Sequence, residues 1–388
     1  MNPAPVPAPR RAFLSTLCST AVSLAACRST NPAHSSSRTP DDFVAAARSW
    51  RAVSGMAPAR DRLSSALRLL DSHHGRLEDH VIAAASNPDF SVPHALASLP
   101  LNSRARTGIY LVLGYRPRVA KSERVINEVA NGLRLQGWRA SVINVPPHGT
   151  TTEDAIALHK ALAADLPKVD RAIAIGFSKG GCDWIRWFAG PASSLPLRQR
   201  QKLSLFISFA GALRGSSVAG WSADAHSVSA RALRLSWRLR DQAEAASILA
   251  EVRSLAPDPW AEQPHLSLRR IAPNLRAVSF AVLPDGPDGH PSTDLKFRLL
   301  SRLASRDNPS IGPGDGLVES AAQILPPQAR TPQQIVRVFG SHALLDGHFA
   351  NGTPVAPLYS SSSPSRWLAG RQLMDVLLRA LPRSAAGW

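Results

Sequence analysis

Residues 174–181 read Ala-Ile-Gly-Phe-Ser-Lys-Gly-Gly, and this short stretch decides the fold. The apolar run just before it, Val169 to Ile175, is typical of a buried strand, and Asp183 to Phe188 follows a helical pattern. A Gly-x-Ser-x-Gly sequence between a strand and a helix predicts a sharp turn, because the flanking glycines let neighbouring chains pass closely. We therefore expect Ser178 in a strained backbone conformation, with its hydroxyl exposed at the N-terminus of a helix.

Apolar runs alternate with helical patterns on both sides of this stretch. Strands are predicted at 107–114, 137–145, 203–209, 274–283 and 334–339. Helices are predicted at 123–135, at 152–166 with Thr152 as its N-cap, and at 365–381. Such alternation predicts an α/β fold, with a mostly parallel central sheet flanked by helices on both faces.

The alternation lapses between residues 212 and 273, which are rich in Ala, Arg, Leu and Trp. A structureless loop of this length is unusual inside a domain. We therefore expect a helical cap insertion over one end of the sheet. Residues 41–105 show helical spacing of apolar side chains and predict a helical N-terminal extension, which precedes an α/β domain at 106–388.

Ser178 is also the candidate nucleophile. Backbone N–H groups and the dipole at a helix N-terminus favour the negative charge that develops on a substrate oxygen. A serine nucleophile needs a base to take its proton, and the base needs an acid to orient it. His342 is preferred to His348 as the base, because a short loop after the strand at 334–339 would set its ring over the turn. Two acids compete: Asp285 follows the strand at 274–283, and Asp315 lies in Gly-Pro-Gly-Asp-Gly-Leu-Val at 312–318.

From about Arg106 to Trp388 these motifs resemble the α/β-hydrolase superfamily. The run Ser-Lys-Gly-Gly-Cys-Asp at 178–183 is similar to the nucleophile elbow of some bacterial lipases. The Asp-Gly-Leu-Val at 315–318 is similar to the segment that carries the acid in bacterial triacylglycerol lipases. The resemblance implies the chain order serine, acid, histidine, and it ranks Asp315 ahead of Asp285. It also implies an oxyanion hole formed by the backbone N–H groups of Lys179 and Tyr115.

The activity that the resemblance implies is that of a serine hydrolase working through an acyl-enzyme. The leading expectation is a lipase or esterase that acts on carboxylic esters with an apolar acyl chain. A peptidase or an acyltransferase would use the same residues, and a non-catalytic envelope lipoprotein that binds through a hydrolase fold is a further alternative. No cofactor and no metal are expected, because the calcium site of lipases is not reproduced: Asp346 stands at the wrong offset after His342.

The first 27 residues predict an export signal. Arg10-Arg11 followed by Phe13-Leu14 resembles a twin-arginine signal, which carries folded cargo. A short apolar stretch then ends in Leu24-Ala-Ala-Cys27, which resembles the lipobox of bacterial lipoproteins. Cys27 is therefore the predicted lipidation site, and the polar residues 28–40 are a flexible tether. We expect an exported protein that is lipid-anchored in the cell envelope, on the periplasmic side of a membrane or at the cell surface.

The formal net charge of +17 comes mostly from arginine, since only 6 of the 45 basic residues are Lys. The basic residues are scattered along the chain, so no specific nucleic-acid partner is predicted; the expected partners are an ester substrate and a membrane. Three cysteines exclude a disulfide scaffold. Beyond the first 30 residues no apolar run reaches the roughly 20 residues that a spanning helix needs.

Overall fold

Strands and helices alternate along the computed structural model, as the sequence predicts. The structure describes residues 101–114, 121–135, 137–240, 242–283, 295–312, 314–331, 333–339 and 342. The export signal with Cys27, the tether, the helical extension at 41–105 (apart from its last residues) and the closing helix at 365–381 therefore lie outside the described residues. Within the described ranges, no helix is both long and apolar enough to cross a membrane.

The strands of the described part form one parallel sheet, with the order β2-β1-β3-β4-β5-β6. Their bounds are Thr107–Val112 (β1), Arg139–Val142 (β2), Arg171–Phe177 (β3), Leu203–Phe209 (β4), Arg276–Leu283 (β5) and Gln333–Phe339 (β6). In β1 every residue is buried, and in β3 every residue except Arg171, as expected for central strands covered on both faces. The predicted α/β class with a parallel central sheet is confirmed.

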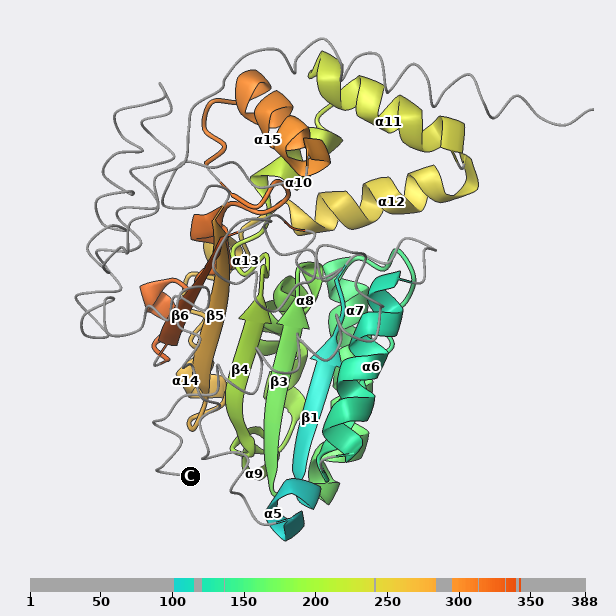
Figure 1. Ribbon diagram of the computed structural model, residues 1–388. Helices are drawn as coiled ribbons and strands as arrows, with labels where there is room; N and C mark the ends of the chain where they lie inside the picture. Colours follow the sequence, from blue (N-terminus) through green and yellow to red (C-terminus); the bar gives the residue numbers. More distant parts are fainter. Residues whose placement is uncertain are drawn as a thin grey trace, which may run out of the picture. The chain divides into compact units, whose positions relative to one another are not determined.

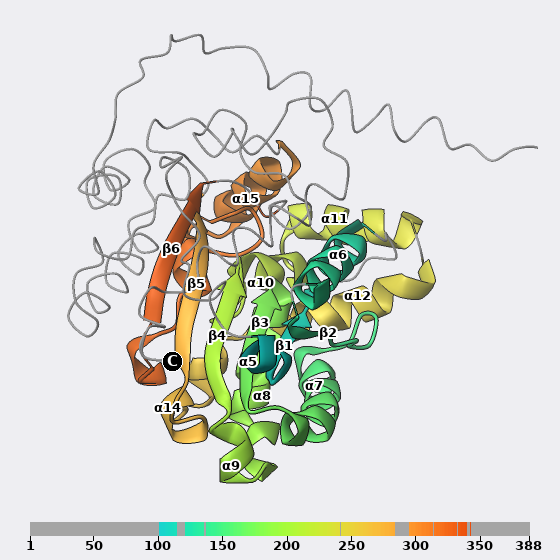
Figure 2. The same cartoon turned by 60° about the horizontal axis from the view of Figure 1, so that its bottom comes forward.

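Helices flank the sheet and extend beyond one end of it. Their bounds are Leu101–Ala105 (α5), Lys121–Leu135 (α6), Thr151–Asp165 (α7), Lys179–Ala189 (α8), Leu197–Arg200 (α9), Ser217–Ala223 (α10), Val228–Arg240 (α11), Gln242–Leu255 (α12), Pro259–Glu262 (α13), Leu268–Ile271 (α14) and Leu295–Asp307 (α15). Short 3₁₀ turns occupy Leu166–Lys168, Pro191–Ser194, Ser320–Gln323 and Pro327–Ala329. Figures 1 and 2 show α6 on one face of the sheet and α7 and α8 on the other.

The start of α7 differs from the prediction by two residues. The N-cap is Thr150 rather than Thr152, because the side chain of Thr150 accepts the backbone N–H of Glu153 while the Glu153 carboxylate accepts the N–H of Thr150. This reciprocal capping box satisfies two backbone donors. A cap at Thr151 or Thr152 could not form one, because the residue three positions later is neither Glu nor Gln.

Aromatic packing fixes α8 against the sheet. Trp184, Trp187 and Phe188 of α8 are fully buried, and the rings of Trp184 and Phe188 both contact Phe206 of β4. Truncation of one such ring typically costs about 3–5 kcal/mol of stability. Because α8 begins directly after Ser178, this packing holds the N-terminus of the helix, and the turn before it, in a fixed position.

Between β4 and β5 the chain forms α10 to α14, where a helical cap was expected. Figure 1 places α10, α11 and α12, together with α15, beyond the carboxyl ends of the strands. Val218 and Trp221 of α10 pack with Ala230 of α11 and Ala304 of α15 in a small separate core. The cap therefore has its own apolar contacts, and it lies at the edge of the sheet where α/β proteins bind ligands.

Candidate active site

Ser178 occupies the sharp turn between β3 and α8. Its φ of 52° and ψ of −123° are strained for a residue with a side chain. Three backbone hydrogen bonds hold this conformation: Ser178 N–H donates to Phe209 O at 2.9 Å, and Ser178 O accepts from the N–H of Gly181 at 3.0 Å and of Ala212 at 3.1 Å. This strand–turn–helix geometry is that of a nucleophile elbow.

Glycines around the elbow allow the chain leaving β1 to pass against it. A Cβ atom added to Gly180 would lie 2.4 Å from the carbonyl oxygen of Val112. A Cβ atom on Gly114 would lie 2.7 Å from the Cβ of Ser178 and 2.9 Å from the backbone nitrogen of Lys179. Any side chain at these positions would push β1 away from the elbow, so the two segments meet here only because both positions are glycine.

Ser178, His342 and Asp315 form a continuous hydrogen-bonded series. Ser178 Oγ lies 2.7 Å from His342 Nε2, and His342 Nδ1 lies 2.8 Å from Asp315 Oδ2. An ionised carboxylate can only accept, so Nδ1 carries the ring hydrogen and Nε2 is free to accept the hydroxyl hydrogen of Ser178. The structure thus brings together the three residues ranked first from the sequence, although their catalytic roles stay predictions.

The loop around Asp315 orients its carboxylate. Oδ1 accepts the backbone N–H groups of Leu317 at 2.9 Å and Val318 at 2.8 Å, and Oδ2 accepts from Gln323 Nε2 at 3.1 Å as well as from His342. In addition, the backbone N–H of His342 donates to the backbone oxygen of Asp315 at 2.9 Å. The acid and the histidine are therefore fixed to each other by both side chain and main chain.

Gln323 is a site residue that the sequence reasoning missed. Its Nε2 donates to Asp315 Oδ2, and its Oε1 accepts the backbone N–H of Val282 in β5 at 2.7 Å. The side chain therefore links the acid to a central strand of the sheet. No motif marks a lone glutamine for this position, and only the folded chain reveals it.

The expected exposure of the Ser178 hydroxyl is not observed. Ser178 is 7% exposed, and both His342 and Asp315 are buried. The serine lies against Gly114 and under the imidazole of His342, whose ring packs edge-on against Phe297 of α15 at a centroid distance of 5.9 Å. The elbow prediction considered the turn alone and could not include these long-range neighbours. Water is thus largely excluded from the serine, which strengthens electrostatic interactions at this point.

The backbone N–H of Lys179, the expected first donor of an oxyanion hole, stands at the N-terminus of α8, directly after Ser178, and its role stays a prediction. Tyr115, the expected second donor, lies outside the described residues. The residue before it, Gly114, is described and lies against Ser178 and Lys179 N. The runner-up acid Asp285 and the alternative base His348 also lie outside the described residues.

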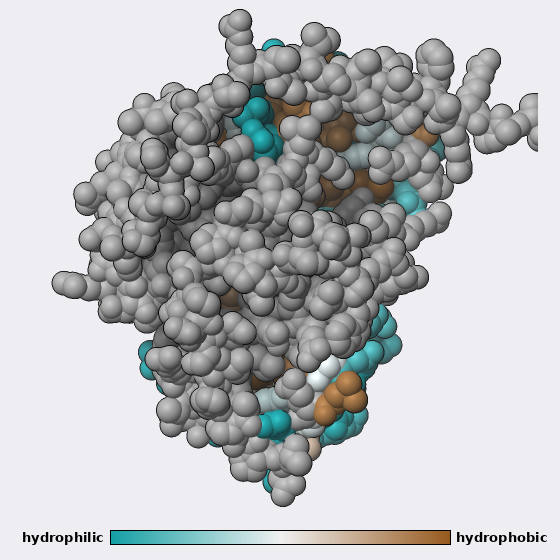
Figure 3. Space-filling model, in the orientation of Figure 1, coloured by the Kyte–Doolittle hydropathy of each residue, from teal (hydrophilic) through white to brown (hydrophobic). Residues whose placement is uncertain are grey.

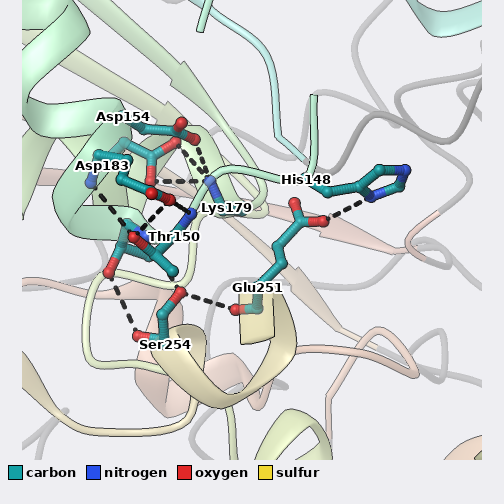
Figure 4. A network of polar contacts seen from close by, with 9 residues as sticks. His148, Thr150, Asp154, Lys179, Asp183, Glu251 and Ser254 are labelled. Carbon is teal, nitrogen blue, oxygen red and sulfur yellow. Dashed lines mark hydrogen bonds and ion pairs between the residues drawn. The ribbon is translucent and has the colours of Figure 1, made fainter. Parts of the chain in front are cut away.

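The side chain of Lys179 enters a buried cluster of charged groups, drawn in Figure 4. Its Nζ forms ion pairs with Asp154 of α7 and with Asp183 of α8, the latter at 3.2 Å. Burial alone would lower the pKa of Lys179, but Asp183 and Asp154 outweigh burial and raise the pKa above its ordinary value. Burial raises the pKa of Asp183 and of Asp154, although Lys179 opposes that rise.

The same cluster reaches the cap through α12. Glu251 of α12 lies 3.1 Å from His148 Nδ1, and Ser254 Oγ accepts the backbone N–H of Thr151 at 3.0 Å. Burial raises the pKa of Glu251 to about 7, against the lowering effect of Lys179 and His148. The polar contacts in Figure 4 therefore connect the elbow residue Lys179, the start of α7 and the end of α12.

Cys182 offers no second nucleophile. It is a free cysteine in the interior of α8, and burial raises its pKa to about 12, so the thiol stays protonated. Among the described residues, no group of three or more His, Cys, Asp or Glu side chains is arranged to hold a metal ion.

Several solved structures match this chain at low sequence identity. A metagenomic carboxyl esterase is 16% identical over a match that covers 83% of this chain and 91% of that chain, with a TM-score of 0.47. The mature form of a Bacillus licheniformis lipase is 14% identical, with 61% and 85% of the two chains covered and a TM-score of 0.38. A thioesterase of prodiginine biosynthesis from Streptomyces coelicolor is 13% identical, with 76% and 96% covered and a TM-score of 0.36.

The chain matches no protein-family model and no curated protein sequence. The solved structures are too distant to transfer residue roles or a substrate to this chain.

Proposed function

We propose that the protein is a serine hydrolase that cleaves carboxylic esters with an apolar acyl chain through an acyl-enzyme. The observation that supports this most strongly is the series Ser178–His342–Asp315, with contacts of 2.7 and 2.8 Å on a strained elbow. A structural serine in a turn needs neither a positive φ nor an imidazole at its hydroxyl.

The first half of the reaction acylates Ser178. Its Oγ bonds to the ester carbonyl carbon while its proton passes to His342 Nε2, and Asp315 stabilises the imidazolium that forms. The N–H of Lys179 donates to the oxyanion, helped by the N-terminal dipole of α8. The bond to the alcohol oxygen then breaks, the alcohol leaves with the proton from His342, and the acyl group stays on Ser178.

The second half returns the enzyme to its starting state. Water bonds to the acyl carbon as His342 takes its proton, and Ser178 then leaves the carbon and recovers the proton. The apolar acyl chain is inferred from the surroundings: Phe297 of α15 packs on His342, and the cap helices lie beyond the carboxyl end of the sheet.

The test compares hydrolysis of p-nitrophenyl esters, from acetate to decanoate, by wild type and Ser178→Ala. We expect the variant to lose at least about 10⁴-fold in kcat/KM, because it lacks the oxygen that accepts the acyl group. A fluorophosphonate probe should label the wild type on Ser178 and leave the variant unlabelled. Equal turnover by both proteins, or a folded wild type that neither turns over esters nor reacts with the probe, would refute the proposal.

We also propose export and lipid anchoring in the cell envelope, with Cys27 as the acylated residue. The support is the order of the twin arginine, the short apolar stretch and the Leu-Ala-Ala-Cys sequence. Labelled fatty acid should be incorporated by the wild type and not by Cys27→Ser in a bacterial host. Labelling of both proteins would reject Cys27 as the site.

A further inference from the structure

The outer face of the cap carries large apolar side chains that are more than half exposed. On α11, Val228 is 71% exposed, Leu235 54% and Leu239 66%. Spacings of seven and four residues place these three side chains on one stripe of the helix. In Figure 3, hydrophobic surface shows between grey atoms in the region where Figure 1 draws α11 and α12.

The opposite side of α11 already provides the contacts that fold the cap. Ala230 is buried with Val218 and Trp221 of α10, and Leu233 packs against the same small core. The helix is thus apolar on two opposite sides, of which one is buried and the other faces outward. Folding does not account for the outer stripe, and large exposed apolar side chains gathered on one helix mark an interaction surface.

Charge indicates the kind of partner. The sequence of α11, Val-Ser-Ala-Arg-Ala-Leu-Arg-Leu-Ser-Trp-Arg-Leu-Arg, contains four arginines and no acidic residue. Arg231 and Arg238 are exposed, and their positions on the helix place both along the same flank of the apolar stripe. Arg234 has a structural role, because it donates to the backbone oxygens of Ser222 and Asp224 at 2.6 and 2.7 Å.

We propose that α11 lies on the surface of an anionic lipid bilayer. Val228, Leu235 and Leu239 enter the boundary between headgroups and acyl chains, while Arg231 and Arg238 contact lipid phosphates. A single outward stripe of aliphatic side chains with arginines beside it is the pattern of helices that lie in the membrane interface. The proposal does not depend on acylation of Cys27 or on the proposed hydrolase activity.

The test measures co-sedimentation of the full chain carrying Cys27→Ser, so that acylation plays no part. The probes are vesicles of pure phosphatidylcholine and vesicles in which about a third of the lipid is phosphatidylglycerol. We expect binding to the anionic vesicles at low salt and little to the neutral ones. Two double variants should each weaken binding to the anionic vesicles by roughly tenfold or more. One combines Leu235→Asp with Leu239→Asp, and the other combines Arg231→Gln with Arg238→Gln.

A matched control is Leu135→Asp at the end of α6, where the wild-type leucine is 90% exposed and is followed by the amino end of β2, at the edge of the sheet opposite to the cap. This variant should bind as the parent does. Circular dichroism melts check that each variant is folded, and binding should persist in Ser178→Ala, which separates this proposal from the hydrolase activity. The proposal would be overturned if both double variants bound as the parent does, or if the parent bound neutral vesicles equally well. It would also be overturned if the wild type were a dimer in solution and Leu235→Asp with Leu239→Asp made that dimer dissociate.

Discussion

Two adjacent residues of the elbow, Ser178 and Lys179, place their side chains in two very different polar groups. The hydroxyl of Ser178 contacts a series with one imidazole and one carboxylate. The ammonium of Lys179 lies among Asp154, Asp183 and, further off, Glu251. Both groups are buried, and each includes one residue of the turn between β3 and α8.

The difference between these two groups lies in how charge is managed. In the first, the Asp315 carboxylate is satisfied by neutral N–H donors, so a positive charge on His342 can form and disappear during a reaction. In the second, the buried ammonium of Lys179 is paired with the carboxylates of Asp154 and Asp183, and removal of the ammonium leaves two buried carboxylates without their partner. The first group is suited to chemistry, and the second to holding the elbow and the cap in place.

Asp315→Asn tests the first group most strongly. The amide cannot hold the Nδ1–H tautomer of His342 that lets Nε2 take the Ser178 proton, so kcat should fall by about 10³–10⁴-fold with little change in stability. Ester hydrolysis measured at several pH values gives this loss. Asp285→Asn is the matched control and should stay near wild type; if Asp285→Asn loses the activity instead, the acid has been assigned to the wrong residue.

Lys179→Met tests the second group. Methionine keeps the length of the side chain but leaves Asp154 and Asp183 buried without a cation, so the free energy of unfolding should fall by about 3–5 kcal/mol. Urea unfolding measures the loss, which should be smaller at pH 5, where the two carboxylates protonate more readily, than at pH 8. Lys168→Met removes an exposed cation that pairs with Asp165 at 3.5 Å, and it should change stability by less than about 1 kcal/mol. Equal losses in the two variants would mean that the buried pairs contribute no more than surface ones.

Glu251→Gln isolates the pH dependence of the contact with the cap. Burial raises the pKa of Glu251 to about 7, whereas an unfolded chain has about 4.3. Between these values the folded protein binds more protons, so its free energy of unfolding falls as pH rises, by up to about 4 kcal/mol in total. Glutamine does not titrate, so in the variant the free energy of unfolding should fall less steeply between pH 5 and 7.5.

The groups that face Glu251 are Lys179, Asp154 and His148. Glu244, an acid on the same helix that is closer to solvent, supplies the control. Unfolding curves at the two pH values should show that Glu244→Gln keeps most of the slope. An unchanged slope in Glu251→Gln would assign the pH dependence to another group.

The first group could be predicted from the sequence because each of its members belongs to a local pattern. Ser178 lies between a strand and a helix, Asp315 lies between glycines, and His342 follows a strand. Each pattern fixes the end of a strand or loop, and parallel strands bring their carboxyl ends to one edge. The sequence could not reveal how deeply Ser178 is buried, since that depends on chains far away along the sequence.

The charged group around Lys179 was not predicted, chiefly because most of its members come together only through long-range packing. Asp183 stands four residues after Lys179 on a helix, and this spacing alone could have indicated their ion pair. Asp154 and Glu251 reach Lys179 only through the packing of α7 and α12 on α8, which no local pattern encodes. The error at the N-cap of α7 is of another kind: the Thr150–Glu153 spacing alone predicts a capping box, whereas the acidic residues Glu153 and Asp154 are equally consistent with a cap at Thr152.

Gln323→Met gives the smallest expected effect, and it tests the contact between the first group and the sheet. Asp315 Oδ2 loses the donor at 3.1 Å, while the Val282 N–H loses its acceptor. We expect kcat/KM to fall by about tenfold and the free energy of unfolding by about 1–2 kcal/mol. Loss of that donor also loosens the Asp315 carboxylate that orients the imidazole of His342, so the fall in rate should appear mainly in kcat and less in KM. Gln328→Met, whose wild-type amide makes a longer 3.4 Å contact with Trp260 O, is the matched control. A fall in stability without a fall in kcat would make Gln323 a support for the loop alone, with no influence on how Asp315 orients His342.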